Sequence, residues 1–305
     1  MTFRRSRTTR PTALKAPRPA VFRPGTGAVG AGRRTRPIRR ASAGITAPRA
    51  SALLVMLLAA AAFYGATASS AFATRAIDVE GATWTSDEEV IRALAVDRDA
   101  NLFALRTSEL ATRVTGLPAV ASASVEVALP DRLRVVVVER TPILIWRVGE
   151  RDLLLDRDGL LFARLDEASR DSIGRLRVIH DDRTASASLG PGDRIDPVDL
   201  DAATRLGSLV PADAGSSARA LNVVITDEQG YLVRAWPDGW TAVFGFYTPT
   251  LRTPELIPGQ VRLLRSLIIG REPTVQRVVL ADDRNGTFIP RPTPEPSPSA
   301  SPSGG

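Results

Sequence analysis

The residues that could do chemistry are few in this chain and belong to no known catalytic pattern. The 305 residues include no cysteine and one histidine, which excludes thiolate sites, disulfides and His-clustered metal sites. That histidine, His180, could act as a base beside Asp181 and Asp182, but no G-x-S-x-G, Walker or H-E-x-x-H motif accompanies it. Asp282 and Asp283 form a second acid pair. Paired-carboxylate catalysis needs facing groups in a pocket, so we interpret both pairs as solvated loop charges.

Two further motifs have simpler structural interpretations. Asp156 and Asp158 could bind calcium, but "DRDG" lacks the remaining EF-hand ligands and is typical of a hairpin turn. The G-x-G-x-x-G pattern at Gly25–Gly30 has neither a strand before it nor a helix after it, so we attribute it to chance. We therefore predict no catalytic residue, no metal and no cofactor, and a protein that is not an enzyme. The tryptophans share no helical face and are expected to be packing residues rather than sugar platforms: Trp84, Trp146, Trp236 and Trp240.

Positive charge is concentrated at the amino terminus. Residues 1–49 hold 13 of the 40 Lys and Arg residues and no acid, whereas the remainder holds 27 basic and 33 acidic residues. This Pro- and Gly-rich arm cannot build a core, and we predict a disordered cytoplasmic tail. Contact of the tail with anionic lipid or nucleic acid is the alternative to a simple topology signal. We favour the topology signal, and nucleic acid is an unlikely partner.

An uncharged run of 25 residues, 50–74, follows the basic tail and is long enough to span a bilayer. The positive-inside rule places the amino terminus in the cytoplasm and everything after Arg75 outside. Ala71–Ala73 resembles a signal-peptidase site, the alternative to a retained anchor. We favour the anchor, and hence a single-pass membrane protein.

Residues 75–143 predict a β-α-α-β-β unit. An alternating strand ends at Glu80, and Ser86 with Glu89 forms a capping box that starts a helix. A second helix ends at Gly116, and a hairpin turns at Pro130-Asp131. The expected result is a three-stranded sheet with two helices on one face.

Residues 144–290 predict a mostly β domain with one late helix. Alternating apolar segments separated by Gly and Asp-Gly turns indicate strands, Gln260–Ile269 is amphipathic, and Thr287–Ile289 follows an Asn-Gly turn as a short last strand. The stretch Asp166–Ala220 gives no clear pattern. Residues 291–305 are rich in Pro and Ser and are expected to be a disordered tail. The fold class is thus α+β, with one transmembrane helix, a β-α-α-β-β domain and a β domain that ends in an exposed edge strand.

Five short motifs occur in this order after the apolar run: Val79-Glu80-Gly81, Asn101-Leu102-Phe103, Leu117-Pro118, Leu129-Pro130 and Glu139-Arg140-Thr141-Pro142. Together with the basic tail and the single span, they resemble the FtsQ/DivIB cell-division proteins. The likeness is good over Ala76–Leu165 and moderate from Trp240 onwards. It implies a POTRA domain packed on a β domain, located at the division septum.

The resemblance also implies partners and a place for them. FtsQ-type proteins use their last strands to engage FtsB/DivIC-like proteins, themselves joined to FtsL-like proteins, and so regulate septal wall synthesis indirectly. An unpaired sheet edge suits such strand addition, and Pro290 and Pro292 limit how far it extends. We therefore expect a contact segment at Thr274–Ile289, with these partner-binding residues: Arg277, Val279, Thr287, Phe288 and Ile289.

Two alternatives remain at this stage. A POTRA protein for polypeptide transport or envelope assembly would usually carry tandem POTRA units and a membrane barrel, whereas one unit is visible here. An extracytoplasmic enzyme acting on the cell wall would need an active site, for which the sequence offers no good candidate.

Overall fold

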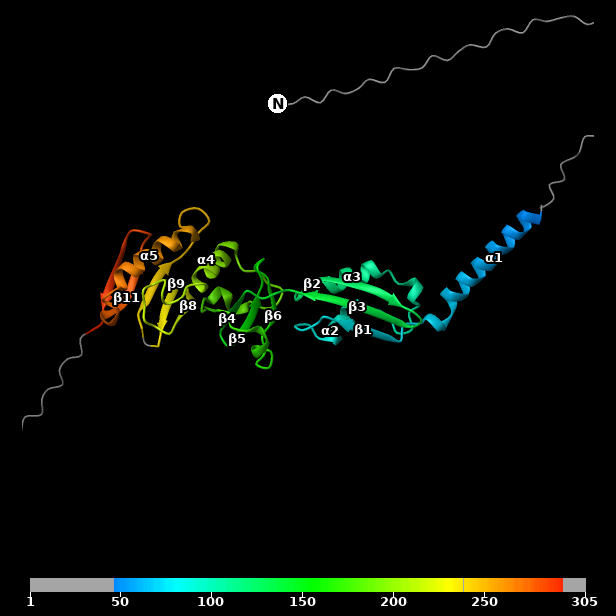
Figure 1. The fold of residues 1–305 in the computed structure, drawn as a ribbon, viewed down its shortest axis with the longest axis horizontal. Coiled ribbons are helices and arrows are strands. Elements are labelled where there is room, and N and C mark those ends of the chain that lie inside the picture. The colour runs from blue at the N-terminus through cyan, green and yellow to red at the C-terminus, as the bar shows by residue number, and fades with distance from the viewer. Residues whose placement is uncertain (1–46, 238, 293–305) are drawn as a thin grey trace, which may run out of the picture. The chain divides into compact units, whose positions relative to one another are not determined.

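The computed structural model describes residues 47–237 and 239–292 (Figure 1). Most of the predicted basic tail, the Gly25–Gly30 motif and all but the first two residues of the predicted Pro/Ser tail lie outside these residues. The chain divides into two compact units, residues 1–55 and 56–305. The described part of the first unit is the beginning of a single long helix.

That helix, α1, runs over Ala47–Ala68 and presents exposed apolar side chains along its length. Among the described residues it is the one helix long and apolar enough to cross a membrane. It ends before Thr74, the predicted limit of the span, because Ser69 caps a separate 3-10 turn at Ser70–Phe72. The predicted apolar helix is therefore present and six residues shorter at its outer end.

The first sheet has three strands in the order β1-β3-β2, with β1 parallel and β2 antiparallel to β3. Two helices follow β1 in the chain, which gives the predicted β-α-α-β-β order. The elements are β1 Ala76–Glu80, α2 Asp87–Leu94, α3 Thr107–Thr115, β2 Val120–Ala128 and β3 Arg132–Glu139, with a 3-10 turn at Leu102–Ala104.

Local sequence signals account for these boundaries. Ser86 and Glu89 form the reciprocal capping box that starts α2. Gly81 has φ +87°, and a Cβ there would collide with the carbonyl oxygen of Val137, so this turn requires glycine. The buried residues around this sheet come from the two helices, the 3-10 turn, β2 and β3, whereas β1 contributes half-buried residues. The buried residues are Val90, Leu94, Leu102, Leu110, Val114, Val120, Val125, Leu133, Val135 and Val137.

The second sheet has nine strands in the order β12-β11-β10-β9-β8-β7-β4-β5-β6. Neighbours are antiparallel except for the parallel pairs β10/β11, β7/β8 and β4/β7. The strands are β4 Leu144–Val148, β5 Arg151–Leu155, β6 Leu161–Arg164, β7 Val178–Asp181, β8 Ala220–Thr226, β9 Gly230–Trp236, β10 Thr241–Gly245, β11 Val275–Leu280 and β12 Gly286–Pro290.

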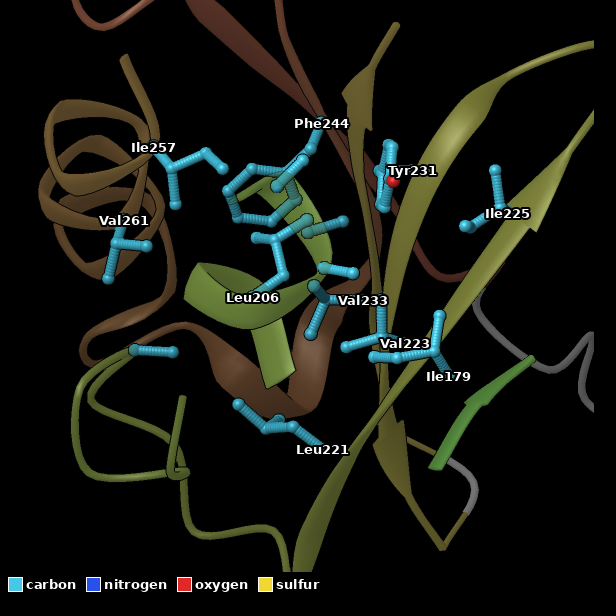
Figure 2. Close-up of a cluster of buried hydrophobic side chains, with 14 of the residues drawn as sticks. Ile179, Leu206, Leu221, Val223, Ile225, Tyr231, Val233, Phe244, Ile257 and Val261 are labelled. Atoms are coloured by element: carbon cyan, nitrogen blue, oxygen red, sulfur yellow. The ribbon is translucent and has the colours of Figure 1, made fainter. Parts of the chain in front are cut away.

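Two helices, α4 Pro197–Gly207 and α5 Ile257–Ile268, pack on one face of this sheet. Figure 2 shows Leu206 of α4 drawn between Ile257 and Val261 of α5 and Val223 and Val233 of the sheet, all members of one buried cluster. Burying this apolar layer contributes about 25 cal/mol per Å² removed from water. Short 3-10 turns complete the unit at Arg170–Ile173, Thr184–Ser188, Pro254–Leu256 and Glu272–Thr274.

The stretch without a clear sequence pattern supplies a central strand and a helix. Within Asp166–Ala220, β7 lies between β4 and β8, and α4 starts at an Asp196 cap. β7 has only four residues, too few for a period-2 pattern to be recognised.

Candidate functional site: the open edge of the nine-stranded sheet

The last two strands form a hairpin whose turn is built by one carboxylate. Asp282 accepts hydrogen bonds from the backbone amides of Arg284 and Asn285, at 2.7 and 2.6 Å, and from the Asn285 side chain. These bonds, with that of the Asn285 side chain foremost, hold the pKa of Asp282 below its usual range. Asp282 and Asp283 are therefore partly exposed turn residues, in the loop where the sequence predicted an acid pair, and the Asp282 bonds fix where β12 begins.

Strand register sorts the predicted partner-binding residues onto two faces. Arg277 lies opposite Ile289, and Val279 lies opposite Thr287. Because side chains alternate along a strand, these four residues share the face of the sheet away from α5. Phe288 lies opposite the fully buried Val278 and faces the helix side.

The side chain of Phe288 is thus partly used by the fold itself. It is half-buried against the core, and the Arg271 guanidinium lies 5.8 Å from its ring centre. The main-chain N–H and C=O groups of Phe288 point in a different direction from its side chain. Ala281 and Asn285 form a hydrogen-bonded pair, so alternation makes Thr287 and Ile289 face β11 and leaves the N–H and C=O of Phe288 pointing outward.

The two edges of the sheet differ. At the β6 edge, Leu161 exchanges hydrogen bonds with the 192–193 segment, and Leu160 bridges to Arg194. At the other edge, β12 is paired with β11 alone within the described residues. Uncovered strand edges are templates for pairing with another chain, and this one is five residues long.

On the sheet face away from α5, a row of aligned side chains runs from β12 across the neighbouring strands β11 and β10. Val243 of β10 lies opposite Val279 of β11, which lies opposite Thr287 of β12. Among the described residues, the apolar cluster that includes α4 and α5 lies on the opposite face. A chain added at β12 would therefore meet a mixed apolar and polar row on one side and α5 on the other.

Arg252, which the sequence did not single out, holds the hairpin in place. Its guanidinium donates to the carbonyl oxygens of Phe244 at 2.5 Å and Leu280 at 2.8 Å, and also to that of Ala281. It thereby ties the ends of β10 and β11 together. No local pattern marks such a residue, because its three acceptors come from segments distant in the chain.

The prediction of a solvated loop pair at Asp181 and Asp182 was wrong for Asp181, whereas Asp182 is exposed beyond the end of β7. Asp181 ends β7 and is 1% exposed, and it accepts hydrogen bonds from Arg183 at 2.8 Å and from the Trp146 indole at 3.1 Å. Burial is the largest single effect and opposes ionisation, but the hydrogen bonds from Arg183 and Ser186 and the Arg183 charge together lower the pKa of Asp181. Arg183 also donates to Asp199 of α4 at 2.7 Å, so the carboxylate belongs to a structural network.

His180 lies on β7 between Arg147 of β4 and Val224 of β8. Burial and the nearby Arg147 charge lower its pKa, so the imidazole is neutral at pH 7. Among the described residues no group of three His, Cys, Asp or Glu side chains could hold a metal ion.

The tryptophans divide by environment. Trp146 and Trp240 are fully buried and Trp84 packs against a buried cluster, as predicted for packing residues. Trp236 is different, because it is 48% exposed with the Arg219 guanidinium 5.8 Å from its ring centre. The prediction of a packing role was therefore wrong for Trp236.

The "DRDG" segment is a turn, as predicted. One oxygen of Asp156 accepts the amides of Asp158 and Leu160, both at 2.9 Å, and the other accepts from Arg140 at 2.7 Å. The neighbouring Glu139 accepts the successive amides of residues 83–85 at 2.8 to 3.0 Å. The Glu-Arg motif thus has a structural role at the end of β3.

Comparison with known proteins first defines the class. Residues 72–140 match the FtsQ-type POTRA domain, so the β-α-α-β-β unit is a POTRA domain. The chain is 26% identical over 246 residues to the cell division protein FtsQ of Chloroflexus aurantiacus, covering 81% of this chain and 80% of that protein. It is 31% identical over 177 residues to FtsQ of Mycobacteroides abscessus, covering 58% and 51%. A third FtsQ, from Koribacter versatilis, is 40% identical over 85 residues, covering 28% of this chain and 24% of that protein. The recognition of an FtsQ/DivIB-family protein with a POTRA domain is thereby confirmed.

Proposed function

We propose that this protein is a non-enzymatic scaffold of the bacterial cell-division machinery that captures partner proteins by strand addition to β12. The FtsQ-type POTRA domain and the FtsQ relatives support a role in division. The single observation that carries the capture mechanism is the contrast between a covered β6 edge and an open β12 edge.

The partner segment would be an extended strand. Its main chain would bond to the outward groups of Phe288 and Gly286, while Pro290 offers no donor and ends the pairing. Alternate side chains would lie beside Thr287 and Ile289 on one face. Those on the other face would lie toward α5, where Leu263 is partly exposed.

The partners we propose are FtsB/DivIC-like and FtsL-like single-span proteins, with the septal wall synthase reached indirectly. In this proposal α1 anchors the chain once in the cell membrane, with its amino terminus in the cytoplasm and its sheets outside. Partners anchored in the same membrane meet in two dimensions, so that weak contacts at a short strand suffice. We also propose that the POTRA domain comprises residues 75–143 and the β domain residues 144–290.

The test uses two isoleucines of similar exposure. Ile289 is 46% exposed on β12, and Ile269 is 52% exposed just beyond α5. In the full chain, Ile289→Lys should weaken capture of an FtsB-like partner at least tenfold, because the lysine ammonium must be desolvated beside the added strand. Ile269→Lys should leave capture unchanged.

Equal capture by the two variants would rule out β12 as the docking strand. Phe288→Lys is less suitable as a test, because that side chain also packs against the core. The division role is tested separately by locating a fluorescent fusion in cells. A band at mid-cell supports it, and a uniform rim would favour envelope transport. Release of fragments from purified peptidoglycan by the chain would contradict a non-enzymatic scaffold.

A further inference from the structure

A side chain of the POTRA domain caps the outer end of α1. The Asn101 amide donates to the carbonyl oxygens of Ala66 at 3.0 Å, Thr67 at 2.9 Å and Ser69 at 3.3 Å. The last carbonyls of a helix have no partners within it, and leaving them unpaired beside lipid is costly. Asn101 supplies those partners from a segment more than thirty residues further along the chain.

A second set of bonds secures the same junction. The backbone amide and the hydroxyl of Thr74 both donate to the carbonyl oxygen of Ala100 at 2.9 Å, and Ala73 pairs with Asn101 in an isolated bridge. Ala73 and Thr74 are buried. The connection between α1 and β1 is therefore a packed joint and not a free linker.

All three strands of the POTRA sheet have an end at this joint. Ala76 at the start of β1 is aligned with Arg132 at the start of β3, which is paired with Ala128 at the end of β2. Arg75 donates its amide to the carbonyl oxygen of Asp131 in the β2–β3 turn at 2.8 Å. The β2–β3 turn and the Asn101 segment thus lie at the same end of the domain as the end of α1.

This end exposes large apolar side chains that no described residue covers. Phe103 is 47% exposed and Leu129, in the β2–β3 turn, is 59% exposed. Phe72 packs edge-to-face against Phe103, with ring centres 5.0 Å apart. Exposure of several large apolar side chains to water at one end of the domain is unfavourable. Exposed apolar groups of this kind mark contact sites.

The length of α1 places these residues at a membrane surface. Its 22 residues span about 33 Å, close to the hydrocarbon thickness of a bilayer. Phe63 and Tyr64 are 69% and 73% exposed near its outer end, where aromatic rings favour the interface. Phe72 follows four residues after the helix ends, so with α1 spanning the bilayer, as proposed above, it would lie at the level of the lipid headgroups.

We propose that the end of the POTRA domain formed by Phe72, Phe103 and Leu129 rests on the outer surface of the membrane, with these side chains in the headgroup and upper acyl region. We call it the lipid-contact end. Asn101 fixes this end to α1, so the domain does not swing freely on its anchor. The inference rests on the proposed membrane anchoring by α1 and not on any division partner.

The lipid-contact end should act through apolar burial and not through charge. Its charged neighbours have both signs: Arg75, Arg98 and Arg132 are exposed there, and so are Asp97 and Asp99, while Asp131 is partly exposed. Arg132 is also paired with Asp78 at 3.2 Å. The two signs largely cancel, so the contact should occur on zwitterionic lipid as well as on anionic lipid.

The absence of cysteine from the sequence permits a direct test. Four single-cysteine variants of the full chain are labelled with an environment-sensitive fluorophore and reconstituted into phosphatidylcholine vesicles containing nitroxide-labelled lipid. Phe103→Cys and Leu129→Cys report on the lipid-contact end. Val138→Cys, 55% exposed near the far end of β3, is the matched control, and Leu57→Cys reports on the anchor.

We expect lipid quenching at positions 103 and 129 at least three times that at 138, unchanged when phosphatidylglycerol is added. Equal quenching at 103, 129 and 138 overturns the lipid-contact end, as does quenching at 103 and 129 that requires the anionic lipid. Strong quenching at 57 alone leaves the proposed anchor intact and removes only this inference. Absence of quenching at 57 removes the anchor, and the inference with it.

The role of Asn101 is tested in the same vesicles. Asn101→Asp places a carboxylate against the helix carbonyls, and should lower quenching at 103 and 129 severalfold with no change at 57. Asn101→Ala should give a smaller loss. Unaltered quenching in both variants would show that Asn101 does not hold this end on the membrane. Circular dichroism of each variant checks that the sheets remain folded.

Discussion

The guanidinium of Arg140 donates a 2.7 Å hydrogen bond to the carboxylate of Asp156, which joins the end of β3 to the turn between β5 and β6. The Nε of Arg140 donates at the same time to the carbonyl oxygen of Pro118 at 3.0 Å. One side chain at the end of the three-stranded sheet thus contacts the segment before β2 and the β5–β6 hairpin of the nine-stranded sheet. The Asp156 side chain is 5% exposed, so the bond is largely shielded from water.

Replacing Arg140 should therefore destabilise the protein. Arg140→Gln leaves the Asp156 carboxylate buried without its cation, which should cost about 3 kcal/mol of unfolding free energy. The measurement is urea denaturation of the full chain in nonionic detergent, monitored by tryptophan fluorescence. Arg106→Gln is the control, because its pair with Glu109 is exposed to water and should contribute little to stability. Equal midpoints for the two variants would contradict a structural role for the Arg140 bond.

Acid should destabilise the network at Asp181. The pKa of Asp181 is lowered from 3.8 in the folded chain, because burial, which raises it, is outweighed by the combined hydrogen bonds of Arg183 and Ser186 and the Arg183 charge. The folded state therefore binds the proton less readily than the unfolded state. The stabilisation is fully present above pH 3.8, and is lost as the pH falls from there through the folded pKa.

The matching variant is Asp181→Asn, which should lower the unfolding free energy at pH 7 by about 3 kcal/mol. It should also flatten the loss of stability below pH 3.8. Part of the acid-induced loss of stability should remain in the variant, because Asp152 also contributes to it. Hydrogen bonding by Arg147 lowers the pKa of Asp152, against the effect of burial. Urea midpoints between pH 7 and pH 3 measure both effects. If the urea midpoint fell as steeply with decreasing pH in the variant as in the parent chain, the pH dependence would belong to other carboxylates.

Arg252 should control the order of the candidate docking edge. Arg252→Lys keeps the charge but cannot reach the carbonyls of Phe244, Leu280 and Ala281 together. We expect amide hydrogen exchange in β11 and β12 to rise at least tenfold while exchange in β4 and β5 stays unchanged. Arg262→Lys, on the exposed side of α5, is the matched control. Unchanged exchange at the hairpin would mean that strand pairing alone orders this edge.

Element types followed from the sequence wherever a local period or cap was strong. The Ser86–Glu89 box started α2, β12 begins at Gly286 of the Asn-Gly turn, and the helix predicted at Gln260–Ile269 is α5, which starts three residues earlier at Ile257. Burial was harder to predict. The Asp181 carboxylate was expected in solvent although it ends a buried strand.

The sequence by itself determined the apolar helix, the β-α-α-β-β order and the alternation of the last hairpin, because these depend on neighbours within a few residues. Only the tertiary structure decided which edge of the large sheet is left uncovered by the described residues, since β7 is inserted between β4 and β8 and the 192–194 segment covers β6. Only the tertiary structure brought Asn101 to the end of α1 and buried Asp181 beside Arg183. Such contacts join residues that are distant in the chain or lie in segments without a local pattern, and their energies depend on packing and solvent exclusion that no local period encodes.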